Sequence, residues 1–202
     1  MGLDITVHRL LSEPKDKNNY FRLTDENGNY KESRFPEWTK PLEREVTEDW
    51  YDWDLYKEKT GIDIDTLEIG MISYGEKSIM TAYPKDMKLF ERSSENYDQY
   101  RAELKKNEIV IDLSTVPLKK VTVKVVYYEE VGYQRKGLNP NFYSDYENDK
   151  IGYFVWSKEE LERYKREYCD EQSDYYDHPK EAFQKNIIDK FQEGTDCVTF
   201  DW

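Results

Sequence analysis

The order of strand-like and helix-like segments along this chain is the feature that most constrains its fold. Runs that alternate or are rich in β-branched residues predict strands at 3–11, 109–113, 118–128 and 151–156, and a closing strand or tail at 197–202. Helix-like segments fall between only some of these runs, at 95–106, 157–169 and 179–194. A doubly wound parallel sheet would place a helix after each strand. The sequence therefore predicts an α+β fold with a mostly antiparallel sheet and two or three helices.

Local signals refine several of these elements. Ser157 and Glu160 form a capping box that starts the second predicted helix, and Pro179 suits the first turn of the third. The dipeptide Asn27-Gly28 predicts a type I′ turn within a hairpin over 18–34. The stretch 35–69, which mixes Pro, Trp and acidic residues, is interpreted as loop and short helix.

The chain is predicted to be one α+β domain over residues 1–202, because it has no repeat and no Gly/Ser linker. A mean hydropathy of −1.01 would by itself favour disorder. The chain nevertheless contains 18 Tyr, 8 Phe and 5 Trp, and these large rings bury much apolar area. We therefore expect a core built more from aromatic residues than from Leu and Ile.

Charge and cysteine content limit the partners and the compartment. The formal net charge of −13 repels phosphate backbones and attracts basic surfaces, which disfavours direct nucleic-acid binding. Only two cysteines, no leader and no run of about 20 apolar residues predict a cytoplasmic protein without a membrane span.

No catalytic signature is evident in the sequence. There is no P-loop, no G-x-G-x-x-G and no nucleophile elbow, and neither histidine has partners at zinc-ligand spacing. We predict no catalytic residue, no cofactor and no metal, and a non-enzymatic protein in preference to an enzyme. Asp63 and Asp65 would share a face on a strand, so a divalent-metal site stays an alternative to the favoured interpretation of a solvated face.

The strongest candidate for a binding site is the acidic and aromatic segment 43–68. It contains ten acidic and three basic residues, a net charge of −7, with Trp and Tyr side chains interleaved. Aromatic anchors in a charged surround are typical of interaction hot spots, and spaced carboxylates can imitate a phosphate backbone. The predicted partner-binding residues are Glu48, Asp49, Trp50, Asp52, Trp53, Asp54, Asp63 and Asp65. The spacing of the two Trp residues suits one side of a helix turn. An acidic surface loop whose aromatic rings turn into the core is the alternative.

A second candidate is the basic loop 132–141, in which Tyr133, Arg135 and Lys136 are predicted to bind an anionic ligand. A nucleotide-like molecule would suit an aromatic pocket. That pocket would be lined by Tyr127, Tyr128, Tyr133, Tyr143 and Tyr153. Arg135 could equally clamp a neighbouring acid.

Two segments carry a resemblance to a known family. The chain opens Met1-Gly2-Leu3-Asp4-Ile5, and residues 130–136 read Glu-Val-Gly-Tyr-Gln-Arg-Lys. It thereby resembles short, mostly uncharacterised phage and prophage proteins that open Met-Gly-Leu-Asp and carry a Gly-Tyr-aromatic-Arg-Lys motif. The chain departs from the family at Gln134, where an aromatic residue is usual, and at 139–143, where the family often has Ile-His-x-Trp-Phe.

The resemblance implies a phage or mobile-element protein in a bacterial cell, and no particular chemistry. Together with the acidic charge, it favours a binding protein that occupies a basic surface of a host protein. A counter-defence inhibitor that mimics nucleic acid, as an anti-CRISPR protein can, is one form of this function. The alternative is a small-molecule or nucleotide-binding protein, or an enzyme, that uses a Tyr-lined pocket with Arg135 and Lys136.

Overall fold

The computed structural model describes residues 3–25, 27–30, 35–74, 78–87, 97–148, 151–170 and 178–201. The chain forms two compact units, the larger from Met1–Val46 and Thr122–Trp202 and the smaller from Thr47–Val121. The single domain over residues 1–202 stays a prediction. Helices combined with mostly antiparallel strands confirm the predicted α+β class. The described residues include five α-helices, so the predicted two or three is too low.

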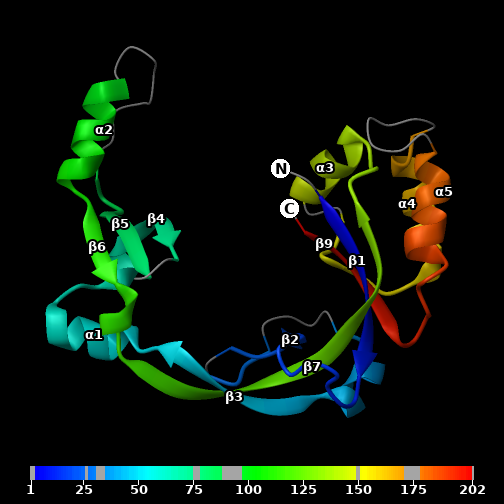
Figure 1. Ribbon diagram of the computed structural model, residues 1–202, viewed down its shortest axis with the longest axis horizontal. Helices are drawn as coiled ribbons and strands as arrows, with labels where there is room; N and C mark the ends of the chain where they lie inside the picture. The colour runs from blue at the N-terminus through cyan, green and yellow to red at the C-terminus, as the bar shows by residue number, and fades with distance from the viewer. Residues whose placement is uncertain are drawn as a thin grey trace. The chain divides into compact units, whose positions relative to one another are not determined.

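One antiparallel sheet organises the larger unit. Its strand order is β2-β7-β1-β9-β8, and β3 also pairs with β7. These strands are β1 (Asp4–Leu11), β2 (Tyr20–Arg22), β3 (Arg44–Tyr51), β7 (Leu118–Arg135), β8 (Phe154–Val155) and β9 (Asp196–Asp201). The first and last strands of the chain, blue and red in Figure 1, therefore lie side by side in the middle of the sheet.

Alternation along the central strands separates the two faces of this sheet. Ile5 of β1 pairs with Phe200 of β9, and Val7 pairs with Val198, so all four side chains lie on one face. Three helices and one π-helical turn pack on that face: α3 (Pro140–Glu147), α4 (Lys158–Tyr168), α5 (Pro179–Phe183) and η4 (Gln184–Ile188). The resulting core is the largest in the described residues, and its buried side chains include ten aliphatic and six aromatic ones.

The opposite face is where aromatic packing dominates. The buried residues His8, Leu10 and Cys197 lie there beneath a cluster of partly buried rings. These rings are Phe21, Phe35, Trp38, Tyr128, Phe154 and Trp156. The 3-10 helix η1 (Glu37–Leu42) carries Trp38 to this cluster. The aromatic core that composition predicts is thus present on one face of the sheet only.

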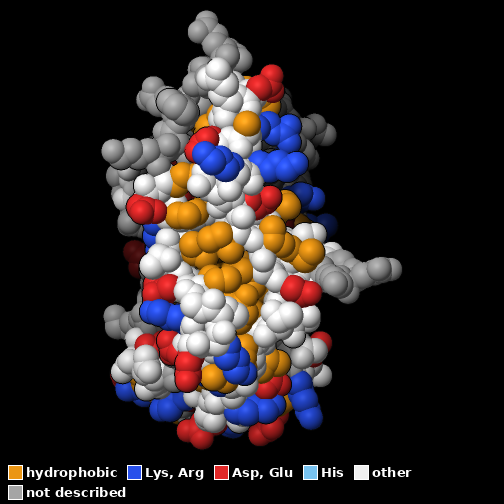
Figure 2. Space-filling view, turned by 90° about the vertical axis from the view of Figure 1, so that its left-hand side faces the viewer, with side chains coloured by type: hydrophobic (Ala, Val, Ile, Leu, Met, Phe, Trp, Pro, Cys, Tyr) orange, Lys and Arg blue, Asp and Glu red, His pale blue; other side chains and the backbone are white. Residues whose placement is uncertain are grey.

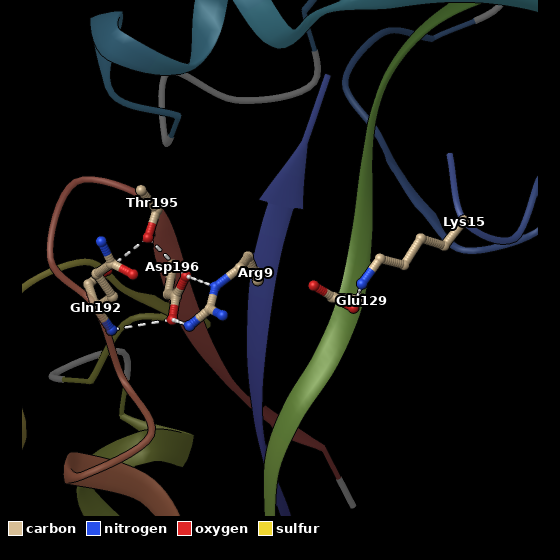
Figure 3. Close-up of polar contacts among 6 residues, drawn as sticks. All are labelled: Arg9, Lys15, Glu129, Gln192, Thr195 and Asp196. Carbon is tan, nitrogen blue, oxygen red and sulfur yellow. Dashed lines mark hydrogen bonds and ion pairs between the residues drawn. The ribbon is translucent and has the colours of Figure 1, made fainter. Parts of the chain in front are cut away.

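A buried ion pair joins the two central strands. Arg9 of β1 donates from Nε and Nη2 to the two carboxylate oxygens of Asp196, each at 3.1 Å. Asp196 is fully buried and also accepts from the Gln192 backbone N–H at 2.9 Å and from Thr195 Oγ1 at 2.8 Å (Figure 3). Lys15 and Glu129 form a second, more exposed pair across β7. The Asp196 carboxylate therefore fixes the start of β9 against β1.

The smaller unit is built on a three-stranded antiparallel sheet, ordered β4-β5-β6. Its strands are β4 (Leu67–Ser73), β5 (Ile79–Pro84) and β6 (Ile109–Asp112). Its helices are α1 (Trp53–Thr60) and α2 (Tyr97–Lys106), and it also contains the short 3-10 turns η2 (Ile64–Thr66) and η3 (Leu113–Thr115). Tyr56 of α1 packs with Met80 and Ile111 on one face of the sheet. Asp52 caps α1 by accepting from the Leu55 N–H at 3.0 Å.

Several predicted elements need correction. The stretch 35–69 is not only loop and short helix, because it contains β3 and the start of β4. The hairpin predicted at 18–34 forms only in part: Thr24 and Tyr30 make an isolated antiparallel bridge around the Asn27-Gly28 turn, whereas β2 pairs with β7. The turn is not type I′, because only Gly28, at φ 80°, has the positive φ that such a turn needs at both central residues. Residues 31–34 lie outside the described residues. The strand at 151–156 shortens to the two residues of β8.

Among the helices, α2, α4 and α5 match predicted segments, and the first two residues of the predicted 95–106 lie outside the described residues. The Ser157 hydroxyl caps α4 by accepting from the Glu160 N–H at 3.3 Å. The Glu160 carboxylate bonds instead to the Tyr164 hydroxyl, so only half of the predicted capping box forms. No helix in the described part of the chain is long and apolar enough to cross a membrane.

Candidate functional site

The acidic and aromatic segment does not form one continuous surface element. Glu48, Asp49 and Trp50 lie on β3, whereas Trp53 and Asp54 begin α1. The prediction that the two Trp residues share one side of a helix turn is therefore wrong, because the strand ends before the helix starts.

Most of the predicted carboxylates have a structural partner. Asp49 forms an ion pair with Lys120 at 2.7 Å, and Glu48 accepts from the Trp50 indole N–H at 2.6 Å. Asp63 pairs with Lys57 at 2.5 Å, and this hydrogen bond lowers the pKa of Asp63 below its usual value. These contacts leave the carboxylates at the surface, but each is oriented by the fold.

Asp63 and Asp65 do not share a strand face. Asp63 instead caps the 3-10 turn η2 by accepting from the Asp65 N–H at 3.1 Å. Among the described residues, no group of three or more His, Cys, Asp or Glu side chains is placed to hold a metal ion.

Trp53 contributes to the core of the smaller unit. Its ring meets Tyr56 edge-on at a centroid distance of 5.8 Å and Tyr51 at 5.6 Å, and it packs against the buried cluster around Tyr56. This is the arrangement of the alternative interpretation, in which the aromatic rings of the segment turn inward. Trp50 is half-buried, with its indole N–H held by Glu48.

A surface that sequence analysis missed lies on the smaller unit. Of the ten large apolar side chains that are exposed in the described residues, eight belong to this unit. They are Tyr51, Ile69, Met71, Ile72, Tyr74, Tyr97, Val110 and Leu118. Figure 2 views the side on which β4, β5 and β6 lie in Figure 1, and apolar side chains gather across its middle with charged ones around them.

Strand β4 is the centre of this surface. Every residue of β4 after Leu67 is exposed, and Ile69 and Met71 are 53% and 62% exposed. The pairing of β4 with β5 shifts by one residue between Ile69 and Met71, at Gly70. The Tyr83 ring explains why a glycine stands at position 70, since a Cβ there would lie 2.5 Å from Cε2 of the ring.

Three cavities lie along the end of β5 beside this strand. One of about 290 Å³ is lined by Glu68, Gly70, Tyr83 and Leu104, between β4, β5 and α2. A second of about 540 Å³ shares Tyr83 and Leu104, and a third of about 570 Å³ shares Pro84 and Lys85 with the first. The first cavity therefore shares lining residues with each of the other two.

The basic loop forms a different arrangement at the end of β7. The Tyr133 hydroxyl donates to Asp4 Oδ1 at 2.7 Å, and Arg135 Nε lies 3.6 Å from the same oxygen. Arg135 thus contacts a neighbouring acid, as its alternative interpretation expects. Lys136 has a φ of 63°, an unusual value for a residue with a side chain. Ligand binding by Tyr133, Arg135 and Lys136 stays a prediction.

The five tyrosines of the predicted pocket do not converge. Tyr127 and Tyr128 are consecutive residues of β7 and point to opposite faces of the sheet, where they meet Tyr20 and Phe21 respectively. Tyr143 packs against the helical core, and none of the three cavities named above includes any of the five.

The environments of the buried titratable side chains indicate structural roles for them. His8 Nε2 and Thr199 Oγ1 form a hydrogen bond of 2.8 Å, and burial lowers the pKa of His8 to about 4. Burial raises the pKa of the Cys169 thiol to about 12 and raises that of Cys197 as well. Neither thiol is thus activated as a nucleophile at neutral pH.

Comparison with known proteins adds no assignment. The chain matches no protein-family model, and no curated protein or solved structure was found to be significantly similar to it. The resemblance to phage proteins, and the function it implies, stay predictions.

Proposed function

We propose that this chain is a non-enzymatic binding protein of phage or mobile-element type, which uses its smaller unit to occupy a basic surface of a host protein in the bacterial cytoplasm. The observation that carries the proposal is the concentration of exposed apolar side chains on that unit, beside exposed carboxylates. A counter-defence inhibitor that covers a nucleic-acid-binding surface is the form that the net charge of −13 favours.

The composition of the surface supports binding to a protein. Exposed apolar patches with a polar rim mark interaction sites, and Met and Tyr are enriched at interface centres. Met71 and Tyr74 are 62% and 79% exposed, and the exposed carboxylates Asp54, Asp65 and Glu68 belong to the same unit. The apolar side chains would supply affinity, and the carboxylates would select a basic partner and accelerate encounter.

The anchor residues of this proposal differ from those predicted from sequence. Trp53 is engaged in the core, and Trp50 is half-buried with its N–H satisfied, so β4 replaces them as the centre of the surface. The acidic residues of 48–65 become its rim.

Affinity capture from bacterial lysate tests the proposal. The Asp54→Lys/Asp65→Lys double variant reverses two exposed charges of the smaller unit, and Glu181→Lys/Glu193→Lys makes the same change in charge at exposed positions of the larger unit. Wild type and the second variant should retain a basic protein that elutes with salt, because screening shortens electrostatic reach to about 8 Å at physiological ionic strength. The first variant should lose it.

The proposal fails if wild type retains no basic protein at low salt. It also fails if both double variants bind equally well, since the contact would then not depend on the charge of the smaller unit.

A further inference from the structure

Strand β4 is exposed on both of its faces. Ile69 and Ile72 pair with Ala82 and Met80, so they point to the side of the sheet that carries the core, yet they are 53% and 39% exposed. Met71 pairs with Thr81 and points to the other side. The shift at Gly70 is what places Ile69 and Ile72 on the same side, because it moves the strand by one residue relative to its neighbour. Apolar side chains therefore flank the strand above and below.

The strand is also the outermost of its sheet in the described residues. Natural edge strands are usually protected by Lys, by Pro or by being very short, because their unpaired backbone groups accept another strand. β4 has seven residues, with no Lys, Arg or Pro among them. The opposite edge strand, β6, has four residues, and Asp112 ends it. The edge of β4 is thus the one suited to accept an additional strand.

The single charged residue of β4 indicates what kind of segment would fit. Glu68 is exposed, and it forms no ion pair with a residue in the described part of the chain. It lines the cavity of about 290 Å³ together with Tyr100 and Leu104, which provide apolar walls for the stem of a long side chain. Lys85 lines the same cavity, but its ammonium group donates to the Asp65 carbonyl at 3.0 Å and not to Glu68. A Lys or Arg side chain could lie along these walls and bring its charge to the carboxylate.

We infer that the edge of β4 binds an extended segment of the partner protein as an added strand, with apolar side chains on the side of Ile69 and Ile72 and a Lys or Arg side chain on the other side, at Glu68. This inference rests on the proposed function and names the partner's contribution to it. Main-chain hydrogen bonds supply affinity in this mode of recognition, and side chains supply specificity. A second copy of the chain is the weaker occupant, because it carries the same net charge of −13 and the same Glu68.

Labelled peptides test the inference on the intact chain. The probe is a seven-residue peptide in which Val and Lys alternate, compared with a Val/Glu peptide and with the Val/Lys peptide N-methylated at alternate amides. Fluorescence polarisation should show binding of the first, with affinity reduced by about tenfold or more for the other two. Backbone amides of 67–73 should gain protection from hydrogen exchange only with the first peptide.

Matched variants locate the contact. Met71→Lys places a charge beside the edge and should reduce binding of the Val/Lys peptide by about tenfold. Val110→Lys is its control, because Val110 is 58% exposed on the same side of the sheet but on β6. Glu68→Lys should also reduce binding, whereas Glu58→Lys, the same change at an exposed position on α1, should not.

Three results would overturn the inference. The first is equal binding of the Val/Lys and Val/Glu peptides, and the second is no binding of either while wild type still captures a basic protein in a salt-sensitive way. The second leaves the proposed function standing and removes only the added strand. The third is a concentration-dependent dimer in sedimentation that Met71→Lys abolishes, which would assign the edge to a second copy.

Discussion

The buried carboxylate of Asp196 provides the sharpest test of how the larger unit is held together. It accepts four hydrogen bonds, two from Arg9 at 3.1 Å, one from the Gln192 N–H at 2.9 Å and one from Thr195 Oγ1 at 2.8 Å (Figure 3). Asp196→Ala removes both acceptor oxygens, and with them all four hydrogen bonds, at the junction of the two central strands. Removing one partner of a buried ion pair typically costs 3–5 kcal/mol, because the other charge stays behind.

The exposure of Arg9 reduces the expected cost of this substitution. The side chain of Arg9 is 35% exposed, so water can solvate much of the guanidinium once its partner is gone. We therefore expect Asp196→Ala to lower the free energy of unfolding by about 3 kcal/mol, at the lower end of that range. Urea unfolding followed by far-UV circular dichroism measures it.

A matched control is available one strand away. Glu129→Ala removes the ion pair with Lys15, whose side chain is 69% exposed, and should cost less than about 1 kcal/mol. If Asp196→Ala costs no more than Glu129→Ala, the carboxylate does not hold β9 against β1, and the reasoning is refuted.

Three further predictions concern backbone strain, a buried histidine and the tryptophans. Lys136→Gly should raise the free energy of unfolding by about 0.5–1 kcal/mol, because φ is 63° at this position, while the same change at Lys119 in β7 should lower it. Because burial lowers the pKa of His8 to about 4, the unfolded state binds a proton between pH 6.5 and about 4 that the folded state does not, and the free energy of unfolding should fall over this range. The free energy lost should reach about 3 kcal/mol. In urea unfolding at several pH values, His8→Phe should show a smaller dependence of stability on pH in this range. Trp53→Ala should lower the melting temperature more than Trp50→Ala, by removing about 3 kcal/mol of core packing; an equal drop would argue against the core role of Trp53.

Sequence patterns predicted the elements that carry local signals. β7 begins with β-branched residues on alternate positions, and α4 begins at a serine that caps it, so both could be placed without knowledge of the fold. Helix α3 carried a signal that was not used: Asn139 accepts from the N–H of Asn141 at 3.1 Å, and Pro140 occupies the first turn. The class could be inferred because the order of elements alone excluded alternating strands and helices.

Strand β3 could not be recognised because its alternation is one of burial rather than of residue type. Arg44, Glu48 and Trp50 are half-buried, whereas Glu45 and Asp49 between them are exposed. Charged side chains occupy both sets of positions, so the period of two that marks a strand is absent from the hydropathy of the segment. Pairing with β7 supplies the energy that the local pattern does not.

The bulge in β4 explains why the sequence did not reveal the proposed binding surface. In β4 the extra residue at Gly70 interrupts the alternation, so Ile69 and Ile72 share one side of the strand although they are three positions apart. A pattern with that spacing resembles a helix face more than a strand, which is why the segment gave no strand prediction. Met71 faces the other side, so apolar side chains are exposed on both sides of an edge that β4 presents without a protecting Lys or Pro. An unprotected apolar edge would be an aggregation hazard unless it is covered, and Glu68 at one end of it favours the covering strand that we propose, one that brings positive charge.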